Sequence, residues 1–424
     1  MTNILVLTAI ERSFYSATIE YQLIDPLLKI SSKRKGIRFI FLTLVPVSFY
    51  FVRGNMRGSF ALFHKRRKRL REGLGQKNFT IFFIPVLFPI KHKSFYLRIF
   101  EVPFFLLANL PILLFFQSIF HPLLIQARGY PAAFLAYLNK RFNKALFLFD
   151  MRDVYTKKGI EAGVFRKDDI SIKLWNLLEK QMVSEADGII VTSQPFKDYV
   201  VNILQNDRKI WTIPNSVNRK RFFPDEEIRR RMRKELAIEN RFVLVHSGTF
   251  STKADIGLAI RYFRKWKQIK EESLFLILMP NKKKVKGIIK IFVEEKINRA
   301  DYKIINPEPE EVSNLLKVGD VGLHLESSSL ATEYCIAIKD GEYLATGLPI
   351  ICTPYLKGIV PLIEEYNVGI VTDPDRDLGI TKEEYLLDNF EEMKNNTKRI
   401  IKDALSLDLA VQTLNKCYER LLSR

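Results

Sequence analysis

The sequence predicts an α/β fold built from two doubly wound, Rossmann-like domains. Short apolar runs alternate with amphipathic stretches along the whole chain, a pattern typical of parallel strands joined by helices. The chain has 424 residues, of which 47% are hydrophobic, and this is enough for two cores of ordinary domain size. Pro, Asn and charged residues cluster between Pro214 and Pro224, which favours a domain boundary there.

The expected strands are short and apolar, and helical patterns fill the gaps between them. In the first domain the strands lie at residues 4–8, 38–44, 123–127, 145–150, 188–192 and 210–214. In the second domain they lie at residues 242–247, 274–279, 302–305, 321–325, 349–353 and 369–372. The helices include residues 172–184, 255–267, 309–316, 342–346 and 405–422.

These elements divide the chain into a first domain over residues 1–215, a second over residues 216–404 and a C-terminal helix over residues 405–424. Ligands of open parallel sheets bind beyond the carboxyl ends of the strands. We therefore expect the two domains to face each other across a cleft that holds the ligand. The functional residues should come directly after strands.

Positive charge is concentrated in the first part of the chain. The formal net charge is +20, and the first 150 residues hold 22 Lys and Arg against 6 Asp and Glu. The densest run comprises Lys65, Arg66, Arg67, Lys68, Arg69 and Arg71, and the apolar segment 79–84 follows it. Basic residues beside bulky apolar ones are typical of binding to an anionic membrane surface. A solvated face is the alternative for this run.

Residues 102–124 form an apolar stretch without Lys, Arg, Asp or Glu that is long enough to span a bilayer. Three prolines argue against a straight span, so we expect a buried or interfacial helix, with a segment that enters the membrane as the alternative. The first residues lack the pattern of a secretion signal, and three cysteines are too few for a disulfide framework. We therefore expect a cytoplasmic protein associated peripherally with the inner face of the cell membrane.

One segment near the C-terminus combines features of an anion-binding site. Residues 339–349 read KDGEYLATGLP. A helix that starts near Lys339 directs backbone N–H groups and a positive dipole end toward an anion, to which Lys339 adds a full charge. Glu342 lies near the first turn, where its carboxylate can accept hydrogen bonds from the two hydroxyls of a ribose. From spacing alone, a capped helix with solvated Lys and Glu side chains is the alternative.

This segment resembles the signature of glycosyltransferase family 4, in which a Lys precedes a Glu-Tyr-x-Ala-x-Gly-x-Pro helix and strand. Further segments resemble family motifs in the right order: FDMRDVY at 149–155, LEKQMVSEADGIIVTS at 178–193, IPNSVNRKRFFPD at 213–225 and VLVHSGTF at 243–250. Together they cover the chain from about residue 120 to its end.

The resemblance implies a GT-B type fold and the transfer of a sugar, with retention, from a nucleotide diphosphate sugar. The second domain would bind the donor and the first domain the acceptor, and the last helix would pack back toward the first domain. The implied donor-binding residues are Asn215, Ser216, Gly248, Thr249, Glu333, Lys339, Gly341 and Glu342. Among them Glu342 would bind the ribose, and Lys339 with the backbone at Gly248 and Thr249 would bind the diphosphate.

The chain departs from the family pattern at places that matter for catalysis. Tyr334 stands where the family often has a sugar-contacting Glu, and Glu333 is one residue away. Arg152 stands where the family often has a His, which leaves Asp153 as the matching acid. Arg152 stays protonated and would hold a phosphate or an acceptor oxygen, unless it pairs structurally with Asp153 or another acid. Lys253, the cation that follows the glycine loop, would stabilise the leaving diphosphate, unless it is a solvated lysine.

Arg152, Asp153 and Lys253 are thus the candidate catalytic residues. The histidines show no metal-ligand spacing, so we expect no metal and no cofactor besides the donor itself. The expected partners are a nucleotide sugar, a lipid-linked or saccharide acceptor and an anionic membrane surface, and no nucleic acid. Two alternatives stay open: a nucleotide-sugar epimerase on the same scaffold, and a non-catalytic, basic membrane or nucleic-acid binding protein with a degenerate GT-B fold.

Overall fold

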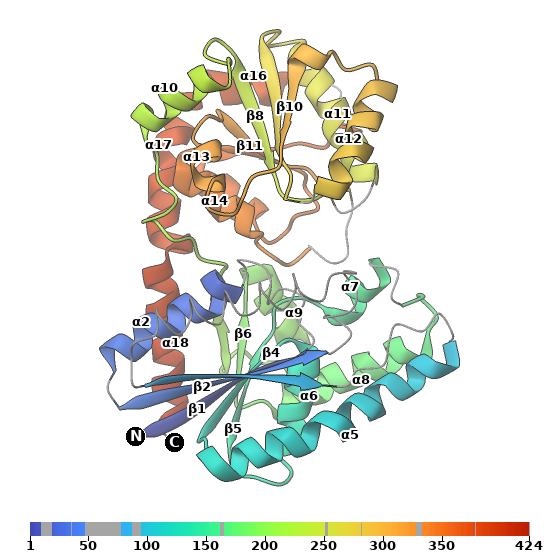
Figure 1. The fold of residues 1–424 in the computed structure, drawn as a ribbon, viewed down its shortest axis with the longest axis vertical. Helices are drawn as coiled ribbons and strands as arrows, with labels where there is room; N and C mark the ends of the chain where they lie inside the picture. Colours follow the sequence, from blue (N-terminus) through green and yellow to red (C-terminus); the bar gives the residue numbers. More distant parts are fainter. Residues whose placement is uncertain are drawn as a thin grey trace. The chain divides into compact units, whose positions relative to one another are not determined.

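The computed structural model describes residues 1–9, 19–34, 36–46, 78–86, 95–161, 165–250, 253–280, 282–327, 333–377 and 379–423. These residues form two compact units (Figure 1). Unit 1 comprises Met1–Ile213 and Ala410–Arg424, and unit 2 comprises Pro214–Leu409. From sequence, the corresponding boundaries were expected after residues 215 and 404, within a few residues of these positions.

Unit 1 contains a parallel seven-stranded sheet in the order β3-β2-β1-β4-β5-β6-β7. Its strands are β1 (Thr2–Ala9), β2 (Ile37–Pro46), β3 (Phe79–Val86), β4 (Leu124–Arg128), β5 (Leu146–Asp150), β6 (Gly188–Val191) and β7 (Ile210–Thr212). The central strands are buried nearly throughout, because helices pack on both faces of a doubly wound sheet.

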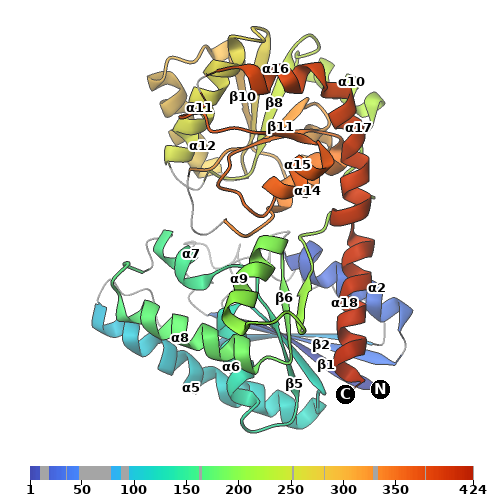
Figure 2. The same ribbon diagram turned by 180° about the vertical axis from the view of Figure 1, so that it is seen from behind.

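The helices of unit 1 are η2 (Glu20–Ile24), α2 (Asp25–Lys33), α5 (Phe95–Phe120), α6 (Tyr130–Asn139), α7 (Tyr155–Glu161), α8 (Ile170–Glu185), α9 (Gln194–Leu204) and α18 (Leu407–Leu422). The last of these begins before the unit boundary, and from Ala410 onward it belongs to unit 1. In α18, the Tyr418 ring contacts Phe39 of β2, and Glu419 forms an ion pair with Arg34, which follows α2. Helix α2 lies beside α18 (Figure 2).

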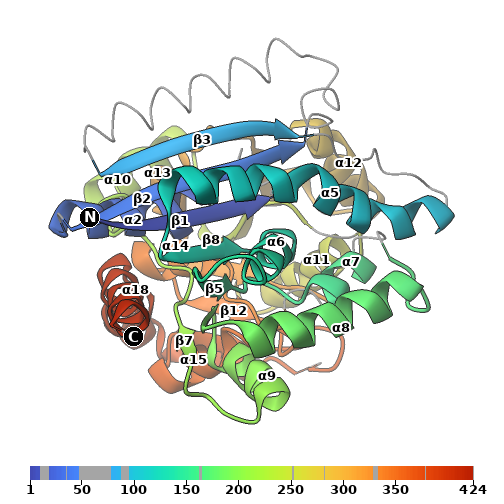
Figure 3. The ribbon, with the colours of Figure 1, turned by 90° about the horizontal axis from the view of Figure 1, so that it is seen from below.

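Strand β3 was missed by the sequence analysis, which assigned residues 79–84 to a membrane-facing apolar segment. In the structure these residues pair in parallel with β2 at the edge of the sheet. Phe79 contacts Phe39 and Phe41, whereas Phe82 faces the opposite side and contacts Phe116 and Phe120 of α5. Figure 3 shows the ribbons of β3 and α5. The alternation of side chains along a strand therefore places these aromatic residues in the packing of both faces.

Helix α5 contains most of the apolar stretch 102–124. It continues through Pro103 and Pro111 and ends at Phe120, before Pro122. Near its C-terminal end Leu113 and Phe116 are buried, while Phe115 and Ile119 remain more than half exposed. Within the described parts of the chain, no helix is both long and apolar enough to cross a membrane. The basic run Lys65–Arg71 lies outside the described residues.

Unit 2 contains a parallel six-stranded sheet in the order β10-β9-β8-β11-β12-β13. Its strands are β8 (Phe242–Ser247), β9 (Ser273–Leu278), β10 (Tyr302–Ile305), β11 (Val321–His324), β12 (Ile350–Cys352) and β13 (Gly369–Val371). Its helices are α10 (Glu226–Glu235), α11 (Lys253–Lys267), α12 (Lys282–Glu294), η3 (Arg299–Asp301), α13 (Val312–Leu316), α14 (Ile338–Thr346), α15 (Val360–Tyr366), α16 (Thr381–Asp388), α17 (Phe390–Ile400) and η4 (Ile401–Leu405). The predicted class of two parallel-sheet α/β domains is confirmed.

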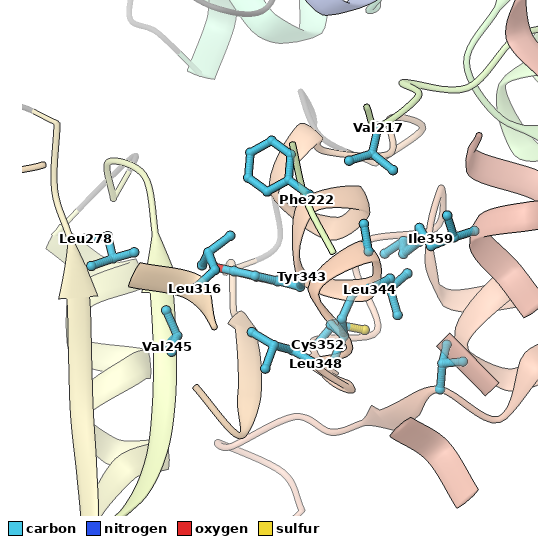
Figure 4. Close-up of a cluster of buried hydrophobic side chains, with 14 of the residues drawn as sticks. Val217, Phe222, Val245, Leu278, Leu316, Tyr343, Leu344, Leu348, Cys352 and Ile359 are labelled. Atoms are coloured by element: carbon cyan, nitrogen blue, oxygen red, sulfur yellow. The ribbon is translucent and has the colours of Figure 1, made fainter. Parts of the chain in front are cut away.

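One apolar core of unit 2 fixes α14 against the sheet (Figure 4). Tyr343 and Leu344 of α14 are fully buried among Val245 of β8, Leu316 of α13 and Ile359. The Tyr343 hydroxyl lies at the end of β8, where it accepts a hydrogen bond of 2.6 Å from the backbone N–H of Ser247. The position of α14 is therefore determined by both packing and a buried hydrogen bond.

Gly322 of β11 is the position at which this packing can be tested. A Cβ atom there would lie 2.4 Å from Cδ2 of Tyr343, so Gly322→Ala must displace the tyrosine ring or the strand. We expect this substitution to lower the free energy of unfolding by about 1–3 kcal/mol, the usual cost of overpacking a core. Urea unfolding followed by circular dichroism measures the change.

Gly287→Ala is the matched control, because a Cβ at this position in α12 meets no atom within 4 Å. Alanine at a helix position is more favourable than glycine by up to about 1 kcal/mol, so this variant should be as stable as the wild type or more stable. Equal stability of the two variants would contradict the proposed packing of α14.

Candidate functional site

The strand order of unit 2 reverses between β8 and β11: β9 and β10 follow on one side, and β12 and β13 on the other. A reversal of this kind leaves a crevice beyond the carboxyl ends of the two strands, where ligands of such sheets bind. Polar residues end both strands, with His246 and Ser247 in β8 and His324 in β11. The N-terminal end of α14 meets them there, since Asp340 contacts His324.

Short-range contacts hold the first turn of α14. Asp340 is buried, and its Oδ2 accepts a hydrogen bond of 2.9 Å from the backbone N–H of Ala337. Gly341 packs on the segment after β7, because a Cβ at this glycine would lie 3.4 Å from Cβ of Val217. Asn215 of the same segment donates from Nδ2 to the carbonyl of Ile336 at 2.6 Å. Gly341 and Asn215 therefore fix the start of this helix.

Four ionisable side chains meet at this helix start, and we call them the α14 cluster: His324, Glu326, Lys339 and Asp340. His324 lies between the two carboxylates, with Nδ1 2.6 Å from Oδ1 of Asp340 and Nε2 3.3 Å from Oε1 of Glu326. Burial alone would lower the pKa of His324, but Asp340 and Glu326 outweigh this effect and raise it. The Lys339 ammonium lies 3.9 Å from Glu326.

Lys339 and Glu342 are the two residues that the sequence singled out in this helix. Burial lowers the pKa of Lys339, and the nearby carboxylates of Glu326 and Asp340 partly offset this lowering. Burial raises the pKa of Glu342 to about 7. The positive charge of Arg221 reduces this rise, and the negative charge of Asp340 increases it. The start of α14 therefore presents a cation and the N–H groups of a helix N-terminus, with a desolvated carboxyl group one turn further on.

The loop after β8 supplies the remaining groups at the strand-order reversal. Gly248 has φ of 114°, a conformation that side chains other than glycine rarely adopt, and its N–H donates to the carbonyl of Leu278. His246 stacks on Phe250 with ring centroids 3.9 Å apart. Its Nε2 is buried and has no hydrogen-bond partner among the described residues. Thr249 is exposed.

A second charged group lies at the carboxyl ends of β4 and β5 in unit 1. Asp150 ends β5 and is fully buried, with its Oδ1 2.5 Å from Nε of Arg152 and its Oδ2 3.7 Å from Nη1 of Arg128. Asp153 pairs instead with Lys158. Of the alternatives left open from sequence, Arg152 therefore pairs with another acid, Asp150, and not with Asp153.

Ser216, Glu333 and Lys253 are three further residues that the sequence predicted for the site. Ser216 is buried beside Val217 in the segment that packs on α14. Glu333 forms a 2.6 Å ion pair with Lys357, so a sugar would compete with that lysine for its carboxylate. Lys253 begins α11, but its side chain lies outside the described residues.

The sequence analysis missed His324, Glu326 and Asp340 as members of the site, and Asp150 and Arg128 in unit 1. His324 ends β11 and Glu326 follows it, so the rule that polar residues after strands carry function would have found these two. Within the described residues, no group of three His, Cys, Asp or Glu side chains has an arrangement suited to a metal ion.

No protein-family model and no curated protein sequence matches this chain. Solved structures, in contrast, match it over its entire length. A sucrose-phosphate synthase from Thermosynechococcus elongatus has a TM-score of 0.68 at 12% identity, with 100% of both chains covered. Anabaena Alr3699/HepE in complex with UDP-glucose has a TM-score of 0.68 at 14% identity, again with 100% of both chains covered.

A glycosyltransferase from Rickettsia africae ESF-5 has a TM-score of 0.65 at 15% identity and covers 99% of this chain and 98% of its own. The chain has the GT-B fold. At these identities the similarity establishes the fold and not the activity.

The raised pKa of Glu342 predicts a particular dependence of stability on pH. Since the pKa is about 7 in the folded chain and about 4.5 in the unfolded chain, the folded state holds more protons between these values, and stability falls as the pH rises through this window. Above pH 7 the ionised, desolvated carboxylate costs about 1–3 kcal/mol, which Glu342→Gln removes.

We therefore expect Glu342→Gln to match the wild type near pH 4.5 and to be more stable at pH 8, by urea unfolding at both values. Glu294→Gln, at an exposed position of α12, is the control and should show no such pH-dependent gain. A Glu342→Gln variant that gains nothing at pH 8 would show that this carboxyl group is well solvated.

Proposed function

We propose that this chain is a glycosyltransferase of the family 4 type, which transfers a sugar with retention from a nucleotide diphosphate sugar to an acceptor. The α14 cluster carries this proposal, because it combines the cation of Lys339 with a helix N-terminus at the strand-order reversal of a parallel sheet. That arrangement suits two phosphates. The carboxyl group of Glu342, one turn along the same helix, suits the hydroxyls of a ribose.

In the proposed reaction the bond between the anomeric carbon of the sugar and the diphosphate breaks, and negative charge develops on the leaving oxygen. Lys339, the first N–H groups of α14 and the backbone at Gly248 and Thr249 would stabilise this charge, with Lys253 as a second cation. Removal of one such preorganised group typically costs about 3 kcal/mol of transition-state stabilisation. The proposal assigns this role to the protein and requires neither a metal nor a cofactor.

The acceptor would bind to unit 1, where Arg152 and Asp153 would orient it. Arg128 and Arg152 bring two guanidinium groups to the carboxyl ends of β4 and β5, where both pair with Asp150. A guanidinium group can hold a phosphate through two parallel hydrogen bonds, so this site suits an acceptor that carries phosphate. We therefore propose a lipid-linked or surface-polysaccharide intermediate as the acceptor, reached at the inner face of the cell membrane.

A nucleotide-sugar epimerase is the second candidate, because it would need the same donor-binding groups. The two differ in their products: a transferase releases nucleoside diphosphate only when an acceptor is present, whereas an epimerase returns a nucleotide sugar. A non-catalytic protein with a degenerate GT-B fold would bind no nucleotide diphosphate at this site.

UDP and UDP-glucose are the first probes, because the similar HepE structures contain them. We expect Lys339→Met to weaken the binding of UDP at least tenfold, about 1.4 kcal/mol, through the loss of a charge-assisted contact with the phosphates. Glu342→Ala should weaken the binding of UDP but leave that of inorganic pyrophosphate unchanged, since pyrophosphate has no ribose. Isothermal titration calorimetry measures both, with GDP and dTDP as further nucleotides.

Lys290→Met is the matched control, since the Lys290 side chain is 78% exposed on α12 and lies in no proposed site. Wild-type affinity in this control with loss in Lys339→Met would support the proposal. If none of these nucleotide diphosphates binds, or if both lysine variants bind equally, the proposal is wrong.

The membrane-associated acceptor predicts lipid binding by the basic run. Replacement of Lys65, Arg66, Arg67, Lys68, Arg69 and Arg71 by Gln should release the protein from phosphatidylserine vesicles, since each cation near an anionic surface contributes about 1 kcal/mol. Replacement of Lys282, Lys283 and Lys284 by Gln is the control and should leave vesicle sedimentation unchanged. Equal sedimentation of the wild type with anionic and with phosphatidylcholine vesicles would contradict the prediction.

A further inference from the structure

His324 is buried at the carboxyl end of β11, and its ring lies between two carboxylates from different parts of unit 2. Asp340 comes from α14, and Glu326 from the loop that follows β11. A neutral imidazole has one N–H group and one nitrogen that only accepts, so it can donate to one carboxylate and must repel the other. Only the imidazolium ion donates to both. The geometry therefore favours a protonated His324, and the raised pKa of this histidine agrees with it.

The carboxylate of Glu326 contacts both His324 and Lys339. The carboxylate lies 3.3 Å from Nε2 of His324 and 3.9 Å from Nζ of Lys339. Glu326 is further fixed by its backbone, whose N–H and carbonyl both bond to the hydroxyl of Thr353. A small rotation of the Glu326 side chain is therefore enough to convert the longer contact with Lys339 into a full ion pair. Such a pair would neutralise the cation that a diphosphate needs.

The charges around His324 come from three elements. Asp340 and Lys339 face it from α14, Glu326 from the loop after β11, and His246 from β8. Burial lowers the pKa of His246 well below its ordinary value, with further lowering by Lys339 and His324, so this ring is neutral. Within the α14 cluster itself, two cations oppose two carboxylates only while His324 is protonated. Asp255 of α11 is a further buried carboxylate, whose charge also acts on Lys339. Loss of the proton from His324 therefore makes the site more negative by one charge, which weakens the binding of phosphates.

We propose that His324 is a positioning residue for the diphosphate site: as an imidazolium ion it holds Glu326 away from Lys339 and fixes Asp340 as the cap of α14. Lys339 and the first N–H groups of the helix then stay available to the phosphates. This inference rests on the proposed function, because it needs a diphosphate to position.

His324→Asn should keep the contact with Asp340 and remove the contact with Glu326. The asparagine amide can replace Nδ1 as the donor to Asp340, but it does not reach Glu326. We expect this variant to bind inorganic pyrophosphate and UDP about tenfold more weakly, as for the loss of one charge-assisted contact. The decisive measurement is rescue: His324→Asn combined with Glu326→Gln should regain wild-type affinity for both probes, because a neutral amide no longer pairs with Lys339. A merely structural role of His324 would give no rescue.

Glu326→Gln alone keeps the test independent of whether His324→Asn folds well. It should bind pyrophosphate as tightly as the wild type or more tightly, and a loss of affinity would overturn the proposal. Selective ¹⁵N labelling of histidine provides a readout that needs no ligand. At pH 7 the spectrum should contain a histidine protonated on both ring nitrogens whose signals are absent from His324→Asn.

The outcomes distinguish this inference from the proposed function. If UDP binds the wild type and His324→Asn equally well, the positioning role is wrong while the glycosyltransferase proposal stands. If no nucleotide diphosphate and no pyrophosphate binds the wild type, both are wrong. A neutral His324 in the ¹⁵N spectrum would overturn the positioning role whatever the binding results are.

Discussion

The contact between His324 of β11 and Asp340 of α14 is the interaction on which the candidate site depends. Both side chains are fully buried, and a buried charge is tolerated only where it is paired and hydrogen-bonded. The same carboxylate caps the helix, so one pair fixes the strand end, the helix start and the direction of the N–H groups. Removal of either partner would leave the other buried with only its remaining contact, Glu326 for His324 and the N–H of Ala337 for Asp340, and a buried charge that loses a partner is strongly destabilising.

Apolar packing brings this pair together. Gly322, two residues before His324, makes room for the ring of Tyr343, and the tyrosine hydroxyl binds the backbone at the end of β8. The helix can therefore approach both strands at the point where their order reverses. Unit 1 has a related arrangement, in which the buried Asp150 at the end of β5 is paired with Arg152 and Arg128. In both units charged groups gather beyond the carboxyl ends of parallel strands, which is where ligands of open α/β sheets bind.

A feature of this fold could be predicted from sequence where it depends on one continuous segment, and not where it depends on contacts between distant segments. The class of fold was predictable because buried parallel strands appear as short apolar runs. Lys339 and Glu342 were recognised because they lie in one continuous segment. The position of His324 at a strand end was open to prediction, but its contact with Asp340 was not. The two residues meet only when α14 packs on β11, so no local pattern reveals the contact. Strand β3 was missed because its residues were interpreted with the basic run that precedes them.

The pairing of Arg152 shows where a physical rule was available and not applied. In an extended segment, side chains two residues apart share a side, which favours Asp150 over the adjacent Asp153 as the partner of Arg152. The observed ion pair between Arg152 and Asp150 follows this rule. Contacts of this kind depend on the direction of side chains, which sequence spacing conveys only when the local conformation is considered.

The most direct test of the account is a crystal structure of the chain with a nucleotide diphosphate sugar bound. The account predicts that the two phosphates contact Lys339 and the N–H groups at the start of α14, with the carboxylate of Glu342 on the ribose hydroxyls. A nucleotide bound elsewhere on the chain, or a Glu342 side chain directed into solvent while the donor is bound, would contradict it.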